Sequence, residues 1–278
     1  MIAEKTLTHE FLIKLEQQEA ACFSEHFQRV PHKLAEWLGI RLINNNGYKA
    51  LMAAGINVLA FNRVIGLGLE NPVREKEVDD IIAFYKDAGI NRFFVQPGPQ
   101  AQLPFLPEML REKGFRHHNN WVKLFRRIDS PMAESGALQI RQIGVEQADI
   151  FANVIIRSFE WPDELQQIIA LPVGRPGWQH YLAYDEEKPV ACAALYINGD
   201  YASLAFAATL PEYRKMGAQS ALIARRFNDA AQLGCRWMIT ETAEETPERP
   251  VTSYRNMRRL GFEVAYNRPN YLFEVNPG

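Results

Sequence analysis

Apolar and polar residues alternate most regularly in the second half of the chain. Residues 218–233 repeat apolar positions at helical spacing and are followed by Gly234, a typical C-terminal cap, so they are predicted to form a helix. Arg225 and Arg226 are expected on its solvated face. Strand-like runs are separated by polar turns, one of them at Asn198-Gly199. The predicted elements are helices at 148–159, 218–233 and 253–260, and strands at 180–184, 190–197, 201–209, 237–240 and 271–275.

The first half repeats this order in outline. Gly89 and Gly114-Phe115 correspond to Gly234 and Gly261-Phe262, with separations of about 25 and 27 residues within the two pairs. This correspondence indicates an internal structural repeat, although two ordinary α/β halves could share it by coincidence. The elements predicted here are strands at 57–67, 92–96 and 121–125 and helices at 73–88 and 106–113.

The segment 128–137 lies between the halves and consists mostly of small and polar residues, with one Pro and one Gly. Such composition is typical of a linker between domains. We therefore predict a first domain at residues 1–130, a linker at 131–137 and a second domain at 138–278.

Composition and charge exclude several classes of protein. The chain has 278 residues and a net charge of −2, so no basic field favours nucleic acid. Its three cysteines are far apart and odd in number, which disfavours a disulfide framework or a zinc site. No run reaches the roughly 18 apolar residues of a membrane span, and residues 1–20 lack the apolar core of a signal peptide. We expect a cytoplasmic monomer or homodimer without nucleic-acid or membrane partners and without a metal.

The junction between the strand at 201–209 and the helix at 218–233 carries the chemistry. The first turn of a helix has unpaired backbone N–H groups and a partial positive charge, which can hold a pyrophosphate where the backbone is open to close approach. Gly217, Ala218 and Ser220 keep that approach open, and Arg214 and Lys215 add positive charge. An isolated Arg-x-x-Gly would more often be a plain strand–loop–helix connection.

This junction resembles the signature of the GNAT-type N-acetyltransferases, Arg/Gln-x-x-Gly-x-Gly/Ala between a strand and a long helix. The signature positions are Arg214, Gly217 and Gln219. Gln219 departs from the small residue of the family, and it fits if its side chain points outward, because only its backbone N–H is needed there. The segment 253–262 is similar to a later helix of the family and its Gly-Phe ending. The resemblance covers about residues 138–278.

The resemblance implies the fold and the co-substrate. It implies an α/β (α+β) chain of two GNAT-like domains, each a mixed, mostly antiparallel twisted sheet flanked by helices. Acetyl-CoA would bind the second domain. By their place in the motifs, the residues that contact it would be Ala207, Ala208, Thr209, Arg214, Lys215, Met216, Gly217, Ala218, Gln219, Ser220 and Asn256.

The first domain has the outline of the second without the phosphate-binding turn. No glycine opens its helix, and Glu70, Glu75 and Glu77 would repel a phosphate. We therefore expect a degenerate GNAT-like domain that binds no CoA and that completes the acceptor cleft or supports the core.

The reaction of the family is the attack of an amine on the acetyl thioester, which requires a polarising N–H group and a proton acceptor. By position, the backbone of 207–209 would polarise the carbonyl. Glu241 is the candidate general base, although a solvated or salt-bridged glutamate is the alternative. The family's thiolate-protonating tyrosine is replaced here by Met257, so Tyr254, Tyr266 or water would substitute, unless these tyrosines are packing residues.

Three functions remain open from the sequence. The first is acetyl transfer from acetyl-CoA to an amine of a small molecule or a protein. The second is a non-catalytic CoA-binding module, sensory or structural, which Met257 favours. The third is nucleotide binding at the Gly217 turn, which the absence of a P-loop or a Gly-x-Gly-x-x-Gly pattern disfavours. The sequence does not identify the acceptor.

Overall fold

The computed structural model describes residues 7–45, 47–99, 105–134 and 136–275. The chain divides into two compact units, residues 1–123 with 264–278, and residues 124–263. The predicted linker at 131–137 comes soon after the change of unit at Leu124, and its residue 135 lies outside the described residues. The division differs from the predicted domains at the C-terminus, because the last strand belongs to the first unit.

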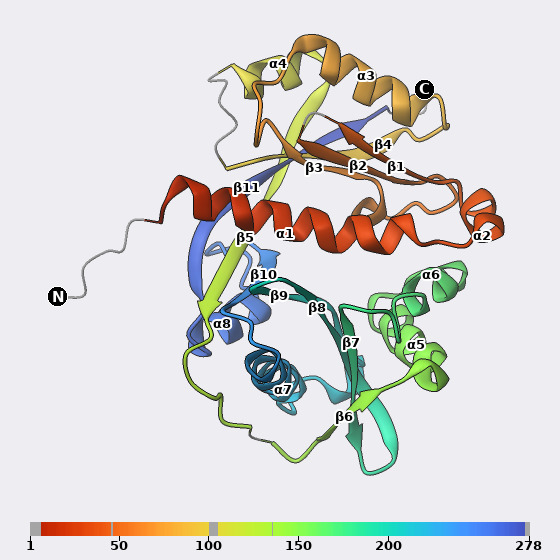
Figure 1. Ribbon diagram of the computed structural model, residues 1–278. Coiled ribbons are helices and arrows are strands. Elements are labelled where there is room, and N and C mark those ends of the chain that lie inside the picture. The colour runs from red at the N-terminus through yellow and green to blue at the C-terminus, as the bar shows by residue number, and fades with distance from the viewer. Residues whose placement is uncertain (1–6, 46, 100–104, 135, 276–278) are drawn as a thin grey trace. The chain divides into compact units, whose positions relative to one another are not determined.

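The first unit is a sheet in the strand order β1-β2-β3-β4-β11-β5, with helices on both faces. In Figure 1, α3 and α4 lie on one face of this sheet and α1 on the other. β3 and β4 are parallel, and β4 and β11 are antiparallel. The elements are α1 (His9–Gln28), α2 (His32–Trp37), β1 (Ile40–Asn45), β2 (Tyr48–Ala53), β3 (Arg63–Leu67), α3 (Glu75–Lys86), β4 (Arg92–Pro97), α4 (Leu106–Glu112), β5 (Phe115–Arg127) and β11 (Glu263–Glu274).

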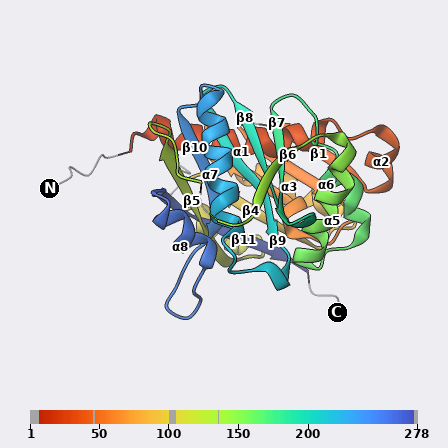
Figure 2. The ribbon, with the colours of Figure 1, turned by 90° about the horizontal axis from the view of Figure 1, so that it is seen from below.

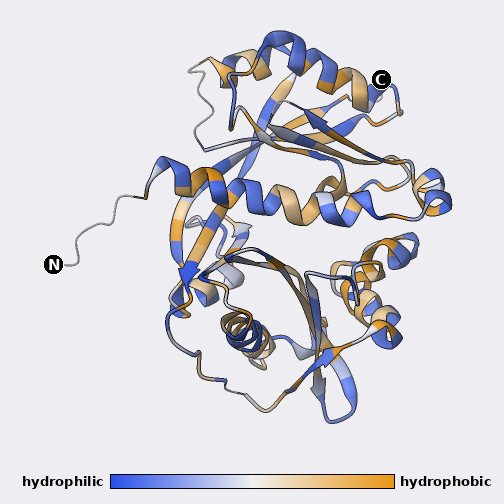
Figure 3. Cartoon of the chain, in the orientation of Figure 1, coloured by the Kyte–Doolittle hydropathy of each residue, from blue (hydrophilic) through white to orange (hydrophobic). Residues whose placement is uncertain are grey.

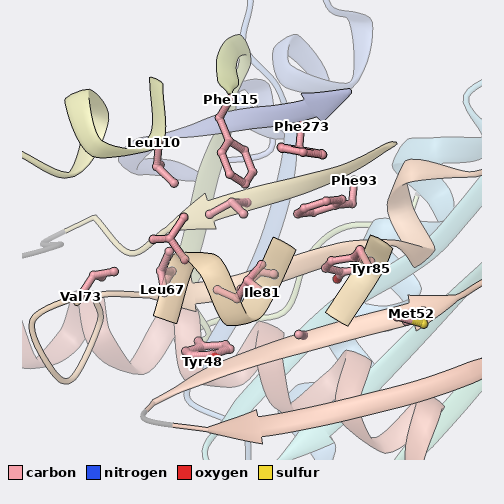
Figure 4. Packing of buried hydrophobic residues seen from close by; sticks show 14 of the residues in the cluster. Tyr48, Met52, Leu67, Val73, Ile81, Tyr85, Phe93, Leu110, Phe115 and Phe273 are labelled. Carbon is pink, nitrogen blue, oxygen red and sulfur yellow. The ribbon is translucent and has the colours of Figure 1, made fainter. Parts of the chain in front are cut away.

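Aromatic rings fill the core between the sheet and helices α3 and α4. Tyr85 stacks on Phe93 with 4.0 Å between ring centroids, and Phe93 stacks on Phe273 at 5.1 Å (Figure 4). Phe115 meets Phe93 edge to face at 5.6 Å. The buried hydroxyl of Tyr85 donates to the carbonyl of Leu51 at 2.7 Å, which satisfies its polar end. Because Phe273 belongs to β11, this core binds the last strand to the first unit.

A buried ionic cluster lies between α1 and the opposite face of the sheet. The Glu19 carboxylate contacts Arg268 at 2.6 Å, Arg63 at 3.3 Å and Lys123, and Arg268 also contacts Glu16 at 3.0 Å. Burial alone raises the pKa of Glu19, but the three cations outweigh burial and hold that pKa well below its usual value. Since Lys123 is on β5 and Arg268 on β11, the cluster ties both strands to α1.

The second unit has the strand order β10-β9-β8-β7-β6, with the end of β5 beside β10. β9 and β10 are parallel, whereas the other pairs from β9 to β6 are antiparallel. α7 packs on one face, over β8 and β9, and α5 packs on the other face (Figures 1 and 2). The elements are β6 (Gln139–Ile143), α5 (Ala148–Phe159), α6 (Gln166–Ala170), β7 (Trp178–Asp185), β8 (Lys188–Asn198), β9 (Tyr201–Thr209), α7 (Ala218–Gln232), β10 (Trp237–Ala243) and α8 (Thr252–Arg259).

The predicted fold class is confirmed, because both units are mixed, mostly antiparallel sheets flanked by helices. The helices carry hydrophilic and hydrophobic residues together, as their amphipathic patterns predict (Figure 3). Among the described residues, no helix is long and apolar enough to cross a membrane. The predicted strand at 271–275 covers only the last part of β11, which begins at Glu263. Its earlier part carries Arg268 and Asn270 at buried positions, which obscures the apolar alternation.

Candidate functional site

Strands β9 and β10 pair only where they begin. The parallel register joins Tyr201 to Trp237, Ala202 to Met238 and Ser203 to Ile239. β9 then continues to Thr209 and β10 to Ala243, and no further pairing between them occurs in this fully described segment. The two strands therefore separate, and backbone groups along the second half of β9 lie outside the ladder with β10.

A bulge lies in this unpaired half of β9. Cys192 of β8 opposes Ala208 and Ala194 opposes Ala205, so two residues of β9, Phe206 and Ala207, face one residue of β8. Phe206 has a positive φ of 44°, which is rare for a residue with a side chain. Bulges redirect the local backbone and are frequent beside active sites. The backbone predicted to polarise a thioester thus has an irregular geometry.

The turn after β9 ends in an open helix start. Gly217 is the N-cap of α7 with a φ of 83°, and no side chain caps the helix. A Cβ built on Gly217 would meet no atom within 4 Å, so the surrounding space is open. The first turn contains no acidic residue. The backbone N–H groups of Ala218, Gln219 and Ser220 therefore form a positive, accessible helix end of the kind that binds phosphate.

Helix α8 brings Asn256 to this helix start. The Asn256 amide donates to the Gln219 side-chain oxygen at 2.5 Å. Arg259, one turn later, donates to the Asn256 oxygen at 2.8 Å and to the Ser220 hydroxyl at 3.4 Å. The sequence reasoning missed Arg259, although its spacing of three residues from Asn256 puts both on one face of a helix. It adds a cation beside the first turn of α7.

The basic residues of the loop lie less centrally. Arg214 is exposed, and its guanidinium donates at 3.3 Å to the carbonyl of Ser158, at the end of α5. Lys215 is exposed with a φ of 69°, and Met216 is also exposed. The structure therefore brings Gly217–Ser220 and Asn256 together, whereas Arg214 is turned toward α5.

Among the acidic candidates, Glu241 lies on β10 beyond the last residue paired with β9, and it is half-buried. Glu245 accepts from the Val251 backbone N–H at 2.9 Å and from Arg255 at 2.6 Å. The backbone hydrogen bond, and then Arg255, lower the pKa of Glu245. A carboxylate fixed in this way is a poor proton acceptor.

The two candidate tyrosines lie in different units. Tyr254 is half-buried on α8, one turn before the buried Met257. Tyr266 is on β11 in the first unit, and its hydroxyl donates to Glu16 of the ionic cluster at 2.5 Å. Burial, and then the Glu16 carboxylate, raise the pKa of Tyr266 well above its usual value. These contacts are of the kind expected for the packing role that the sequence left open as its alternative.

In the first unit, the corresponding parallel strands, β3 and β4, do not separate. β3 pairs with β4 from Arg63 opposite Phe94 to Leu67 opposite Pro97, with a register shift between Ile65 and Leu67, and the Gly98 N–H continues the ladder to the Leu67 carbonyl at 2.9 Å. The helix that follows, α3, begins with Glu75 and Glu77 in its first turn. Glu77 accepts from the Arg74 backbone N–H at 2.8 Å. This helix end is neither open nor positive.

Comparisons with known proteins agree with this geometry. Residues 147–255 match the family model described as the acetyltransferase (GNAT) family. A search of curated proteins found no match. The chain is similar to a solved GCN5-related N-acetyltransferase from Kribbella flavida, with 17% identity, a TM-score of 0.62, and coverage of 95% of this chain and 96% of that one.

Two further solved structures extend over the same length. One is a GCN5-related N-acetyltransferase from Sphaerobacter thermophilus, with 12% identity, a TM-score of 0.57, and coverage of 98% of this chain and 95% of that one. The other is a tandem GNAT protein from the clavulanic acid biosynthesis pathway, with 15% identity, a TM-score of 0.55 and 98% coverage of both chains. At identities this low, the structural similarity shows a shared fold alone. Residues 147–255 thus form a domain of the acetyltransferase (GNAT) family, in a chain with the fold of a tandem GNAT protein.

Proposed function

We propose that this protein transfers the acetyl group of acetyl-CoA to an amine acceptor. The observation that carries the proposal is the uncapped start of α7 at Gly217, which Asn256 contacts through Gln219, in the connection between two parallel strands, β9 and β10, that separate. An uncapped, positive helix end attracts a pyrophosphate, and separated strands offer backbone groups to an extended pantetheine arm. The match to the GNAT family supports the same co-substrate.

In this proposal the pyrophosphate of acetyl-CoA is held by the backbone N–H groups of Gly217–Ser220, with Asn256 and Arg259 beside them. The backbone of Ala207–Thr209 lies along the acyl end. A backbone N–H at the β9 bulge would stabilise the negative charge that develops on the carbonyl oxygen, which is the largest electrostatic contribution in acyl transfer. Acetyl-CoA itself supplies the activated thioester.

Side chains of the protein then accept and donate the protons of the reaction. Glu241 accepts a proton from the amine as the C–N bond forms, directly or through water. The C–S bond breaks, and the CoA thiolate receives a proton from Tyr254 or from water. Tyr254 is favoured over Tyr266 because the hydroxyl of Tyr266 already donates to Glu16 in the first unit.

A second candidate function is the binding of CoA without turnover, in a sensory or structural role. It is favoured by Met257, which is buried at the position where the family resemblance puts the proton-donating tyrosine. A thioether cannot protonate a thiolate. This candidate keeps the same binding residues and removes the reaction.

The test combines calorimetry with an assay for free thiol. We expect acetyl-CoA to bind with one site per chain, and CoA thiol to be released when small amines or peptides with free amines are supplied. Glu241→Gln should keep the binding and slow the release at neutral pH, with Glu244→Gln as the neighbouring control. Binding without thiol release on every acceptor would favour the second candidate. Stabilisation by ATP or NAD, but not by acetyl-CoA, would refute both.

A further inference from the structure

Arg226 of α7 is one of the most completely buried charged residues in the protein. Its side chain is 1% exposed, contrary to the solvated position that the sequence predicts. The guanidinium Nε donates to the carbonyl of Leu222, one turn earlier in α7, at 3.0 Å. Its Nη1 donates to the carbonyl of Ala194 on β8 at 2.8 Å. Among the described residues it forms no salt bridge, and this is unusual for a buried arginine.

The groups around Arg226 leave its positive charge uncompensated. Burial lowers the pKa of Arg226 to about 10, so the group stays protonated at neutral pH. Its electrostatic neighbours are the Tyr181 hydroxyl and the Cys192 thiol, and burial raises the pKa of both, so both are neutral. The nearby carboxylate, Asp229, is bound to Arg225 at 3.0 Å and to the Tyr181 hydroxyl at 2.7 Å.

The acceptor of the Arg226 bond lies at the edge of the β9 bulge. Ala194 is the residue of β8 at which the regular register stops, opposite Ala205, and Cys192 is the residue at which it resumes. The Cys192 thiol contacts the carbonyl of Phe206, the bulged residue with positive φ, at 4.0 Å. A rarely populated backbone conformation persists only where its surroundings fix it. Arg226 adds a positive charge to those surroundings through its bond to Ala194 and its interaction with Cys192.

We propose that Arg226 is a positioning residue for the acetyl thioester. It ties α7, whose first turn would hold the pyrophosphate, to β8 opposite the bulge that would polarise the acetyl carbonyl. The distance between the two halves of the acetyl-CoA site is thereby fixed, and a permanent positive charge lies behind the bulge. This inference rests on the proposed function, because it concerns the same bound acetyl-CoA.

Infrared spectroscopy of bound acetyl-CoA carrying a ¹³C-labelled acetyl carbonyl tests the inference without any acceptor. A carbonyl polarised by the bulge absorbs at a lower frequency than the same carbonyl in free acetyl-CoA. Arg226→Met should bind acetyl-CoA with an affinity within about threefold of the wild type and lose most of that frequency shift. Arg225→Met, at the preceding residue, removes an arginine of the same helix that bonds to Asp229 and to the carbonyl of Ile140 on β6, and it should keep the shift.

Kinetics with an active acceptor give a second readout. Arg226→Met should lower kcat by about tenfold or more, as the loss of one polarising interaction does, with KM for acetyl-CoA almost unchanged. Arg226→Lys keeps the charge but loses the planar donor pair, and it should show an intermediate kcat and frequency shift.

The outcomes separate this inference from the function on which it rests. A full frequency shift and an unchanged kcat in Arg226→Met would overturn the positioning role while leaving acetyl transfer in place. If Arg226→Met does not fold, Arg226→Lys decides, because a shift equal to that of the wild type overturns the inference and a reduced one supports it. A wild-type protein that does not bind acetyl-CoA would refute the proposed function, and the inference with it.

Discussion

Each unit of this protein contains a pair of parallel strands joined by a helix, β3 with β4 in the first and β9 with β10 in the second, and the two pairs differ at one end. In the first unit β3 stays paired with β4 through Leu67, and Gly98 extends the ladder. In the second unit β9 leaves β10 after Ser203. An opening between parallel strands therefore comes from residues at the end of the ladder, because the strand–helix–strand arrangement is common to both units.

The helices α3 and α7, which follow β3 and β9, also differ in their first turns. α3 begins with two glutamates, one of which accepts from the Arg74 backbone N–H and neutralises the helix end. α7 begins at Gly217 without a cap and without an acid. Of these two helix ends, the second has the features that favour a bound anion. The comparison suggests that a few residues per unit separate a ligand site from a supporting domain.

The interiors of the units also differ. On the α1 face, the first unit buries two carboxylates among three cations, whereas beneath the bulge the second unit buries Arg226 among backbone carbonyls and neutral groups. The ionic cluster links elements from both ends of the sequence and so helps to hold the first unit together. Arg226 links a helix to a strand at the proposed reaction site.

The largest expected effect comes from breaking the ionic cluster. Arg268→Met leaves Glu16 and Glu19 buried with too little positive charge, and removal of one partner from a buried ion pair costs roughly 3–5 kcal/mol of unfolding free energy. Urea unfolding measures this cost. Arg116→Met removes an exposed partner of Glu274 on the neighbouring β5 and should cost no more than about 1 kcal/mol. Similar costs for both variants would contradict the assembly role of the cluster.

A smaller but more specific effect is expected at the start of α7. Gly217→Glu adds a negative charge and a side chain at a position of positive φ, and we expect acetyl-CoA affinity to fall about 100-fold, or about 2.7 kcal/mol. Gly234→Glu, just beyond the other end of α7, imposes the same backbone strain, since Gly234 also has positive φ and open space around it. Calorimetry should show near-normal affinity for this control. Equal losses would indicate strain in place of a phosphate site.

As the pH falls, the first unit should lose stability before the second unit does. The folded-state pKa of Glu19 lies below its unfolded value, so its stabilising contribution is complete above the unfolded value and is lost as the pH falls through the folded one. Urea unfolding at a series of pH values below 5 can follow Trp121, which lies near the guanidinium of Arg268, and Trp237 of the second unit in single-tryptophan variants. We expect the Trp121 transition to move to lower urea first. Parallel shifts of both probes would remove this distinction between the units.

The smallest effect is expected at Asn256. Asn256→Ala removes one hydrogen-bonding side chain beside the helix start, so acetyl-CoA affinity should fall about fivefold to tenfold, or about 1 kcal/mol. Asn228 lies farther along α7, where its side chain bonds to the backbone of Met132, and Asn228→Ala should leave the affinity unchanged. Titration calorimetry compares the two. An unchanged affinity in Asn256→Ala would remove this residue from the site.

Local sequence patterns predicted the helices and strands of the second unit well, because these elements are amphipathic and the candidate binding turn is contiguous in the chain. They did not predict the membership of β11, which depends on the partners of Arg268 and Phe273 far away in sequence. The prediction that Arg226 lies on a solvated helix face was wrong for a related reason. A charged residue on a helix is normally solvated, and only the carbonyl of Ala194 on β8 explains its burial.

The central claim is that acetyl-CoA binds the separated strands of the second unit and not the paired strands of the first. Hydrogen exchange of the wild-type protein, with and without acetyl-CoA, tests it most directly. We predict slower exchange of backbone amides at residues 204–220 and around Asn256, and unchanged exchange at residues 63–77. Protection at residues 63–77, or its absence at 204–220, would contradict the account.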